Sequence, residues 1–307
     1  MAVLLVFLGL AIMLVGIRVM SCGLSRAVGP RMRGLLHHLT RTPLVGFLTG
    51  IVAAAAAQSS SLVTVLLVGM VDAGLLDYAQ AFSIMLGANV GTTFTLQLLA
   101  LSRDSYALPL FCAGLALVAF FRRGYLYYLG CIFLGSGSIF LGFSLTSMAC
   151  AGIEHEPSFR NWLAQRAHDP YYGLMLGCVV TGIIQSSSAV MGMVAAMARE
   201  GLVSLHLAVS ICLGANVGTC VTSLLTSLGT GVAGRRTAVA HLLFNILGAA
   251  ALFPLLPWFV PMVAATSLDP ALQTANAHTI FNVVTALFAL PLTSWFVSLV
   301  LRLVPDK

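Results

Sequence analysis

The sequence predicts an all-α integral membrane protein, an inverted-topology repeat with about seven transmembrane helices and two re-entrant hairpins. Three observations support this fold class: a very apolar composition, a repeat within the chain, and the distribution of arginine between apolar stretches. Only 8% of the 307 residues are charged, and the mean hydropathy is +1.01. A soluble protein of this size needs more polar surface, so most soluble enzymes are excluded.

Charge and cysteine usage narrow the class further. The net charge of +6 comes from Arg, because Lys307 is the only lysine. No basic run is interleaved with aromatic residues, so we expect a lipid bilayer and no nucleic acid as partner. The seven Cys have no CxxC and no metal-ligand spacing, which predicts neither a disulfide framework nor a zinc site. The first apolar stretch, 1–17, lacks a charged n-region and a cleavage site, so we expect a retained helix.

A repeat relates residues 43–100 to residues 170–227 at a constant offset of 127, with 24 identities in 58 positions. The identities concentrate in two blocks, Gln-Ser-Ser-Ser and Gly-Ala-Asn-Val-Gly-Thr. Matches at an offset of 126 between the first apolar stretch and the one at 125–148 extend the repeat to the preceding helix. The predicted organisation is a single transmembrane domain at 1–307, with repeats at 7–100 and 133–227 and completing helices at 228–307.

Arginine placement predicts the orientation, because short basic loops tend to stay cytoplasmic. The predicted spans are 1–22, 78–101, 106–121, 125–148, 204–228, 237–256 and 277–301. They place eleven basic residues inside: Arg18, Arg26, Arg31, Arg33, Arg41, Arg122, Arg123, Arg235, Arg236, Arg302 and Lys307. Four lie outside: Arg103, Arg160, Arg166 and Arg199.

This division requires the stretches 43–76 and 170–200 to enter and leave on the same face, as re-entrant hairpins. Each arm has about 15 residues, whereas about 20 are needed to cross the hydrocarbon, so an arm reaches only the midplane. The first repeat then runs from outside to inside and the second from inside to outside. Such inverted repeats are typical of secondary transporters that bind substrate near the midplane.

The Gln-Ser-Ser-Ser blocks lie at the predicted hairpin tips. The second arm of each hairpin starts there, and its free N–H groups, with the hydroxyls and amide, attract anions. Non-helical backbone at membrane depth needs protein or a water-filled cavity around it, so we expect both tips to face one polar site. The alternative role is hydrogen bonding between packed helices. The residues concerned are Gln58, Ser59, Ser60, Ser61, Gln185, Ser186, Ser187 and Ser188.

The Gly-Ala-Asn-Val-Gly-Thr blocks place Gly and Asn inside apolar helices. Glycine weakens a helix, and local unwinding would free carbonyls for a hard cation. Asn and Thr oxygens add neutral ligands that suit Na⁺, whereas carboxylates would favour Ca²⁺. The alternative is a close helix crossing of small residues. The candidate Na⁺ ligands are Asn89, Thr92, Thr95, Asn216, Thr219 and Thr222.

No Arg or Lys lies in either hairpin tip or either Gly-Asn-Gly segment. An anion bound there would meet only helix ends and hydroxyls, and burying an uncompensated ion costs several kcal/mol. The sequence therefore predicts coupling to cations that bind with the anion. Two late His-x-x-Phe-Asn patterns add intramembrane polar groups, for which we expect a supporting or packing role. Their polar members are His241, Asn245, His278 and Asn282.

The duplicated Gln-Ser-Ser-Ser followed by Gly-x-Asn-x-Gly-Thr resembles the type II sodium-dependent phosphate cotransporter family. The resemblance covers 7–100 and 133–227, and the His-x-x-Phe-Asn helices extend it to about Leu290. It implies Na⁺-coupled symport of inorganic phosphate across a plasma membrane, the inner membrane in bacteria. It also implies that the Gln-Ser-Ser-Ser residues bind phosphate, and that no cofactor and no enzymatic activity are involved.

Two features depart from that family's pattern. Many relatives carry a His-containing segment where 106–121 has neither His nor Asn. Some bacterial relatives append a cytoplasmic helical domain, whereas this sequence ends at Lys307, so we expect any such regulator to be a separate chain.

Three other functions fit parts of the pattern. The same scaffold could carry another oxyanion or a carboxylate, or export phosphate. An intramembrane hydrolase would use a Ser with His241 or His278, but no G-x-S-x-G turn is present. A pure assembly protein would need only the small residues that promote helix packing.

Overall fold

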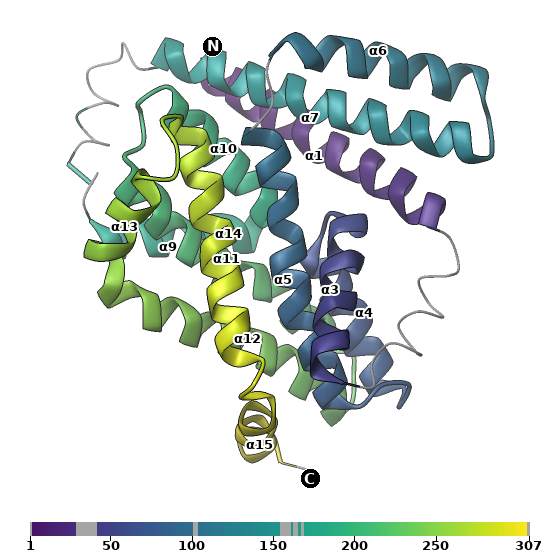
Figure 1. The fold of residues 1–307 in the computed structure, drawn as a ribbon, viewed down its shortest axis with the longest axis vertical. Coiled ribbons are helices and arrows are strands. Elements are labelled where there is room, and N and C mark those ends of the chain that lie inside the picture. The colour runs from purple at the N-terminus through teal and green to yellow at the C-terminus, as the bar shows by residue number, and fades with distance from the viewer. Residues whose placement is uncertain are drawn as a thin grey trace.

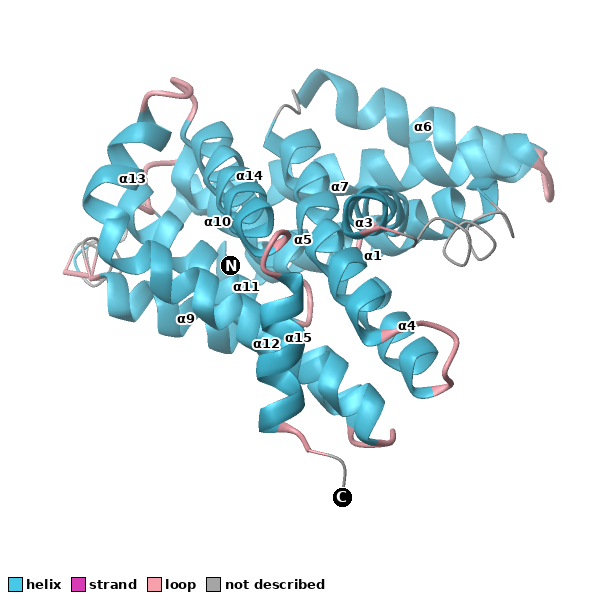
Figure 2. Cartoon of the chain, turned by 60° about the horizontal axis from the view of Figure 1, so that its bottom comes forward, coloured by secondary structure: helices cyan, strands magenta, loops and turns pink. Residues whose placement is uncertain are grey.

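The computed structural model describes residues 2–28, 42–100, 104–153, 161, 165–166 and 169–305, and their regular structure is entirely helical (Figures 1 and 2). The first half holds α1 (Ala2–Val28), α3 (Pro43–Ala57), α4 (Ser60–Asp72), α5 (Tyr78–Ala100), α6 (Asp104–Phe120) and α7 (Tyr125–Ile153). The second half holds α9 (Pro170–Ile184), α10 (Ser187–Arg199), α11 (Leu205–Ser227), α12 (Val232–Leu252), η1 (Phe253–Leu255), α13 (Leu256–Ala264), α14 (Pro270–Ala289) and α15 (Thr293–Leu303). The basic positions Arg31, Arg33, Arg41, Arg103, Arg160 and Lys307 lie outside the described residues.

Four described helical stretches are long and apolar enough to cross a membrane: Tyr78–Ala100, Tyr125–Thr146, Leu205–Ser227 and Val232–Ala264. A bent pair, α14 with α15, makes five if it counts as one span. Shorter apolar helices include Leu4–Met20 and Ala107–Phe120. The chain is therefore a multi-pass membrane protein, while seven spans stay a prediction.

The predicted span 277–301 is wrong as one continuous helix. The chain bends by 84° between α14 and α15. Pro291 lies at the bend, where it cannot donate an N–H and its ring obstructs a continuing helix. The predicted span 237–256 also differs, since its helix begins at Val232 and continues through a 3-10 turn to Ala264.

Helices α1 and α7 pack against each other at glycines, beside α6 (Figure 1). A Cβ on Gly9 would lie 2.7 Å from the carbonyl oxygen of Gly142, and one on Gly16 would lie 2.8 Å from that of Gly135. Because the partner number falls as the α1 number rises, the two helices are antiparallel. Only residues without a side chain allow this approach.

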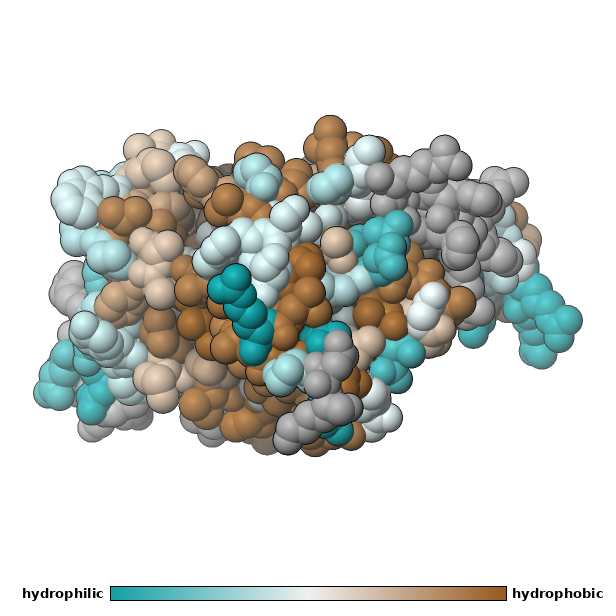
Figure 3. Space-filling view, turned by 90° about the horizontal axis from the view of Figure 1, so that it is seen from below, coloured by the Kyte–Doolittle hydropathy of each residue, from teal (hydrophilic) through white to brown (hydrophobic). Residues whose placement is uncertain are grey.

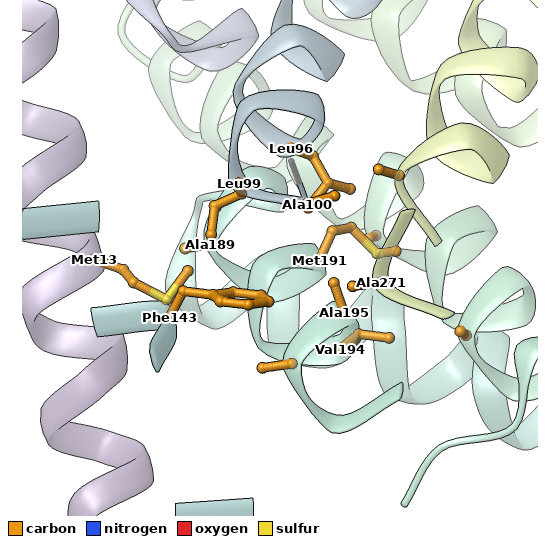
Figure 4. Close-up of a cluster of buried hydrophobic side chains, with 14 of the residues drawn as sticks. Met13, Leu96, Leu99, Ala100, Phe143, Ala189, Met191, Val194, Ala195 and Ala271 are labelled. Atoms are coloured by element: carbon orange, nitrogen blue, oxygen red, sulfur yellow. The ribbon is translucent and has the colours of Figure 1, made fainter. Parts of the chain in front are cut away.

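One apolar core joins the two halves of the chain (Figure 4). Met13 from α1 and Phe143 from α7 meet Leu99 from α5 and Met191 from α10, and each is at most 1% exposed. Burying such side chains contributes roughly 1.5–3 kcal/mol each, which fixes α10 against both α5 and α7. Many large apolar residues are also exposed on the outside of the molecule. Figure 3 shows apolar surface between scattered hydrophilic residues on one face, and such a surface suits a lipid environment.

The C-terminal ends of α4 and α10 are each tied to the start of a later helix. Asp72 accepts a hydrogen bond at 2.8 Å from the backbone N–H of Gly231, which precedes α12. Arg199, at the position equivalent to Asp72, forms a 2.8 Å ion pair with Asp269, which caps α14. We call these two contacts the α4–α12 latch and the α10–α14 latch. They hold each Gln-Ser-Ser-Ser element to one His-x-x-Phe-Asn helix.

Candidate functional site

Each Gln-Ser-Ser-Ser block forms a sharp turn between two short helices. Helix α3 ends before Gln58, which adopts a left-handed conformation with φ of 53°, and α9 ends before Gln185 with φ of 58°. These two are the non-glycine residues with positive φ in the described part of the chain. Such a conformation costs of order 1 kcal/mol or more and persists only where the surroundings enforce it. The same strained turn therefore occurs twice, at equivalent positions.

The first serine of each block caps the helix that follows. The Ser59 hydroxyl accepts a hydrogen bond from the N–H of Leu62 at 3.1 Å, and the Ser186 hydroxyl accepts one from Ala189 at 3.3 Å. Helices α4 and α10 thus begin within these blocks. The remaining first-turn N–H groups have no acceptor within their own helix and carry the positive end of its dipole.

Both turns line one cavity of about 480 Å³. The first turn contributes Gln58 and Ser59, and the second contributes Gln185 and Ser186. The remaining wall comes from α1 and from apolar residues beside the turns: Leu14, Ile17, Arg18, Cys22, Ala57, Leu62 and Ile184. A cavity of this size lies in the range of small-molecule sites. The two turns therefore line one common cavity, whose polar groups come mainly from the turns and from Arg18.

The other four members of the blocks are not part of this wall. Ser60, Ser61, Ser187 and Ser188 lie in the first turns of α4 and α10 and are between 2% and 7% exposed. The Ser188 hydroxyl is buried and has no hydrogen-bond partner among the described residues.

Arg18 is the residue that sequence reasoning missed. It lines the cavity between both turns, although the sequence predicts no cation near them. It comes from α1, outside the repeated blocks, so the repeat by itself does not indicate it. A signal was present, because Arg18 is the only charged residue among the first 25, and an ionisable residue inside an apolar helix marks a functional site.

The two glutamines differ in environment. Gln58 is 4% exposed, donates from its amide to the carbonyl oxygen of Ala55 at 2.6 Å, and accepts a hydrogen bond from the Thr95 hydroxyl. Gln185 is exposed, and its side chain makes no hydrogen bond within the described structure. Thr222, the equivalent of Thr95, has a buried hydroxyl with no partner among the described residues. One turn is thus held by its helix, while the other presents its amide to the cavity.

The Gly-Ala-Asn-Val-Gly-Thr blocks do not unwind, so the expected free carbonyls are wrong. Helices α5 and α11 are continuous through them. A Cβ on Gly87 would collide with the carbonyl oxygen of Phe47 in α3, and one on Gly214 with that of Leu174 in α9. These glycines therefore allow two helices to cross closely, which is the alternative role that the sequence left open for them.

The threonines and asparagines of these blocks are buried and mostly bonded within their own helix. Thr92 and Thr219 donate to carbonyls four residues back, at 2.9 Å and 2.8 Å. Asn216 donates to the carbonyl of Cys212 at 2.9 Å. Their remaining oxygen lone pairs stay able to accept or to coordinate.

Asn89 connects its helix to the first His-x-x-Phe-Asn helix. Its amide donates to the side-chain oxygen of Asn245 at 3.0 Å, and its own oxygen lies 3.4 Å from Nε2 of His241. The other ring nitrogen of His241 lies 3.1 Å from the hydroxyl of Ser223. This buried network spans α5, α11 and α12 and places His241 and Asn245 behind Asn89.

The second His-x-x-Phe-Asn helix is less connected. Asn282 donates to the carbonyl of His278 at 2.8 Å. Its own oxygen and Nδ1 of His278 are buried without partners among the described residues. The structure therefore joins Asn89, His241 and Asn245 and leaves Asn216, His278 and Asn282 without the matching bonds. No group of three or more His, Cys, Asp or Glu that could hold a metal occurs among the described residues.

Comparison with known proteins gives one family. Residues 12–148 and 154–265 match the family described as Na⁺/Pi-cotransporter. A Bacillus subtilis (strain 168) protein called "Uncharacterized protein YqeW" is 37% identical over 269 residues, which cover 84% of each chain. No solved structure matches.

Two further relatives have names that state a function. The "Putative inorganic phosphate export protein YjbB" of Escherichia coli (strain K12) is 27% identical over 256 residues, 83% of this chain and 46% of that protein. The "Sodium-dependent phosphate transport protein 2A" of Oryctolagus cuniculus is 36% identical over 95 residues, 28% of this chain and 14% of that protein. The chain thus spans less than half of either relative.

Proposed function

The chain belongs to the Na⁺/Pi-cotransporter family, and we propose that it is a secondary active transporter that carries inorganic phosphate together with Na⁺. The observation that carries this proposal is the single cavity lined by both Gln-Ser turns. The family consists of transporters and not enzymes, so the hydrolase alternative falls away. The proposed location is the plasma membrane, the inner membrane in a bacterium.

Phosphate is the proposed occupant of the cavity. Gln58, Ser59, Gln185 and Ser186 line it, with the Gln185 amide free to take a ligand, and two helix N-termini start beside them. Backbone N–H groups at such termini bind phosphate oxygens readily. The four buried serines, Ser60, Ser61, Ser187 and Ser188, complete the proposed site when the turns move.

The proposed Na⁺ ligands are the side-chain oxygens of Asn89, Thr92, Thr95, Asn216, Thr219 and Thr222. Side-chain oxygens alone would form this site, because the continuous helices α5 and α11 supply no free backbone carbonyls. What favours them is burial together with neutral oxygen chemistry, and in one case an unpartnered hydroxyl, that of Thr222.

Alternating access between two inverted repeats is the proposed mechanism. Helices α3 and α4 are about 22 Å and 20 Å long, so each can reach past the middle of a 30 Å hydrocarbon layer without crossing it. The antiparallel contacts of Gly9 with Gly142 and of Gly16 with Gly135 fit a two-fold axis, because the repeat exchanges Gly9 with Gly135 and Gly16 with Gly142. Each turn would then open the cavity to one face.

The test is radiolabelled phosphate uptake into proteoliposomes under an inward Na⁺ gradient, against an equal K⁺ gradient. We expect uptake only with Na⁺, and none in the double variant Gln58→Ala, Gln185→Ala. Uptake at the same rate in K⁺ would contradict coupling, and no uptake in either gradient would contradict phosphate as substrate. For topology, cysteines at Arg122 and Arg166 should react with impermeant reagents from opposite sides.

Phosphate export is a second candidate, because the E. coli relative is named for it. The same vesicles, preloaded with phosphate, separate the directions. Efflux that proceeds without Na⁺, with no Na⁺-driven uptake, would favour export over symport.

A further inference from the structure

One cationic side chain, that of Arg18, lies in the wall of the cavity that both Gln-Ser turns line. Arg18 lies on α1, drawn in purple in Figure 1, one helical turn after Leu14 and one turn before Cys22. All three line the cavity, so the side of α1 that carries Arg18 faces it.

The rest of that wall is neutral. Its polar members are the amides of Gln58 and Gln185 and the hydroxyls of Ser59 and Ser186, and the remaining residues are apolar or, for Cys22, weakly polar. Among the described residues that line this cavity, the Arg18 guanidinium is thus the one formal charge. An oxyanion there meets one fixed positive charge as well as two helix N-termini.

Arg18 has no competing partner among the residues that the structure describes. It makes no ion pair and no hydrogen bond within the described parts of the chain, whereas Arg199 pairs with Asp269. Its side chain is exposed toward the cavity and free to take a ligand. A structural arginine in an apolar helix would be expected to hold a carboxylate or a carbonyl.

We propose that Arg18 binds the transported oxyanion, phosphate, directly through a bidentate contact to two of its oxygens. This inference rests on the proposed function and adds a residue from outside the repeated blocks. Guanidinium geometry matches two oxygens of such an anion, whereas an ammonium offers only a point charge. The fixed charge also lowers the number of Na⁺ ions needed to neutralise the bound anion.

The test compares Arg18→Gln and Arg18→Lys with the wild type in the uptake assay. We expect the phosphate KM to rise about tenfold or more in Arg18→Gln, with a smaller rise in Arg18→Lys. The matched control is Arg26→Gln, which removes an exposed arginine from the same helix outside the cavity wall and should leave the KM unchanged. Active wild type with an unchanged KM in Arg18→Gln would overturn this proposal and leave the proposed function standing.

Cys22 supplies a readout that does not depend on transport. It lines the same cavity and its thiol is exposed. Its labelling by an anionic and by a cationic methanethiosulfonate reagent can be counted by peptide mass spectrometry. In the wild type we expect the anionic reagent to label Cys22 faster than the cationic one, and phosphate to protect Cys22 from labelling. In Arg18→Gln we expect both effects to be lost. If phosphate still protects Cys22 in Arg18→Gln, the proposed contact is wrong. If phosphate neither protects Cys22 in the wild type nor is transported by it, both proposals are wrong.

Discussion

The hydroxyl of Thr95 donates a hydrogen bond to the side-chain oxygen of Gln58, and this bond has no counterpart in the second half of the described structure. The equivalent pair is Thr222 and Gln185, in which the hydroxyl is buried without a partner and the glutamine is exposed. Two turns with one sequence and one backbone conformation thus hold their glutamines differently. The proposed alternating access would need such a difference between the two turns in each single state.

Thr95→Val should destabilise the protein more than Thr222→Val. The first change leaves the buried oxygen of Gln58 without its donor, at a cost of about 1–3 kcal/mol, whereas the second removes a hydroxyl that bonds nothing. Unfolding in detergent without Na⁺ measures both. Equal losses would contradict the asymmetry, and weaker Na⁺ activation of transport in Thr222→Val alone would support its role as a Na⁺ ligand.

The Asn89 to Asn245 contact should appear as a coupling energy. In a double-mutant cycle with Asn89→Ala and Asn245→Ala we expect about 0.5–3 kcal/mol, because the two side chains share a buried hydrogen bond. The equivalent cycle with Asn216→Ala and Asn282→Ala is the control, since no bond joins those side chains in the described structure. Similar coupling in both cycles would contradict the arrangement.

The α10–α14 latch should be sensitive to salt. Asp269→Asn keeps a capping oxygen for α14 but removes the charge that pairs with Arg199. Because the two side chains are 27% and 39% exposed, we expect a loss of about 1 kcal/mol or less, diminishing as salt rises. Asp169→Asn, which changes the cap of α9, is the control. A loss independent of salt, or equal in the control, would argue against the ion pair.

The glycine crossings should tolerate no side chain. Gly87→Ala and Gly214→Ala each direct a Cβ into a backbone carbonyl of the neighbouring helix, so we expect little folded protein. Gly69→Ala, within α4, meets nothing within 4 Å and should raise stability by up to about 1 kcal/mol through helix propensity. Folded yield by size-exclusion chromatography after detergent extraction distinguishes them, and normal yields for all three variants would refute the crossings.

Local features were predictable wherever chemistry acts within a few residues. The repeated Gln-Ser-Ser-Ser blocks mark the turns because Ser is a favoured helix cap and the polar run interrupts an apolar stretch. The ends of α5 and α11 fall within one residue of the predicted spans, because the length of each apolar stretch determines where its helix begins and ends. The sequence did not predict the bend near Pro291, because hydropathy is averaged over many residues and a single proline changes that average little.

By itself, the sequence determined the membrane class, the two equivalent turns and the residue types that could face an anion and a cation, because periodicity, capping and hydropathy are properties of neighbouring residues. Only the tertiary structure decided that α1 brings Arg18 to the turns, that the glycines of α5 and α11 serve crossings instead of unwinding, and that Gln58 is bonded while Gln185 is not. These outcomes depend on which distant helices touch, and the free energy of those contacts is shared among residues that no local pattern connects.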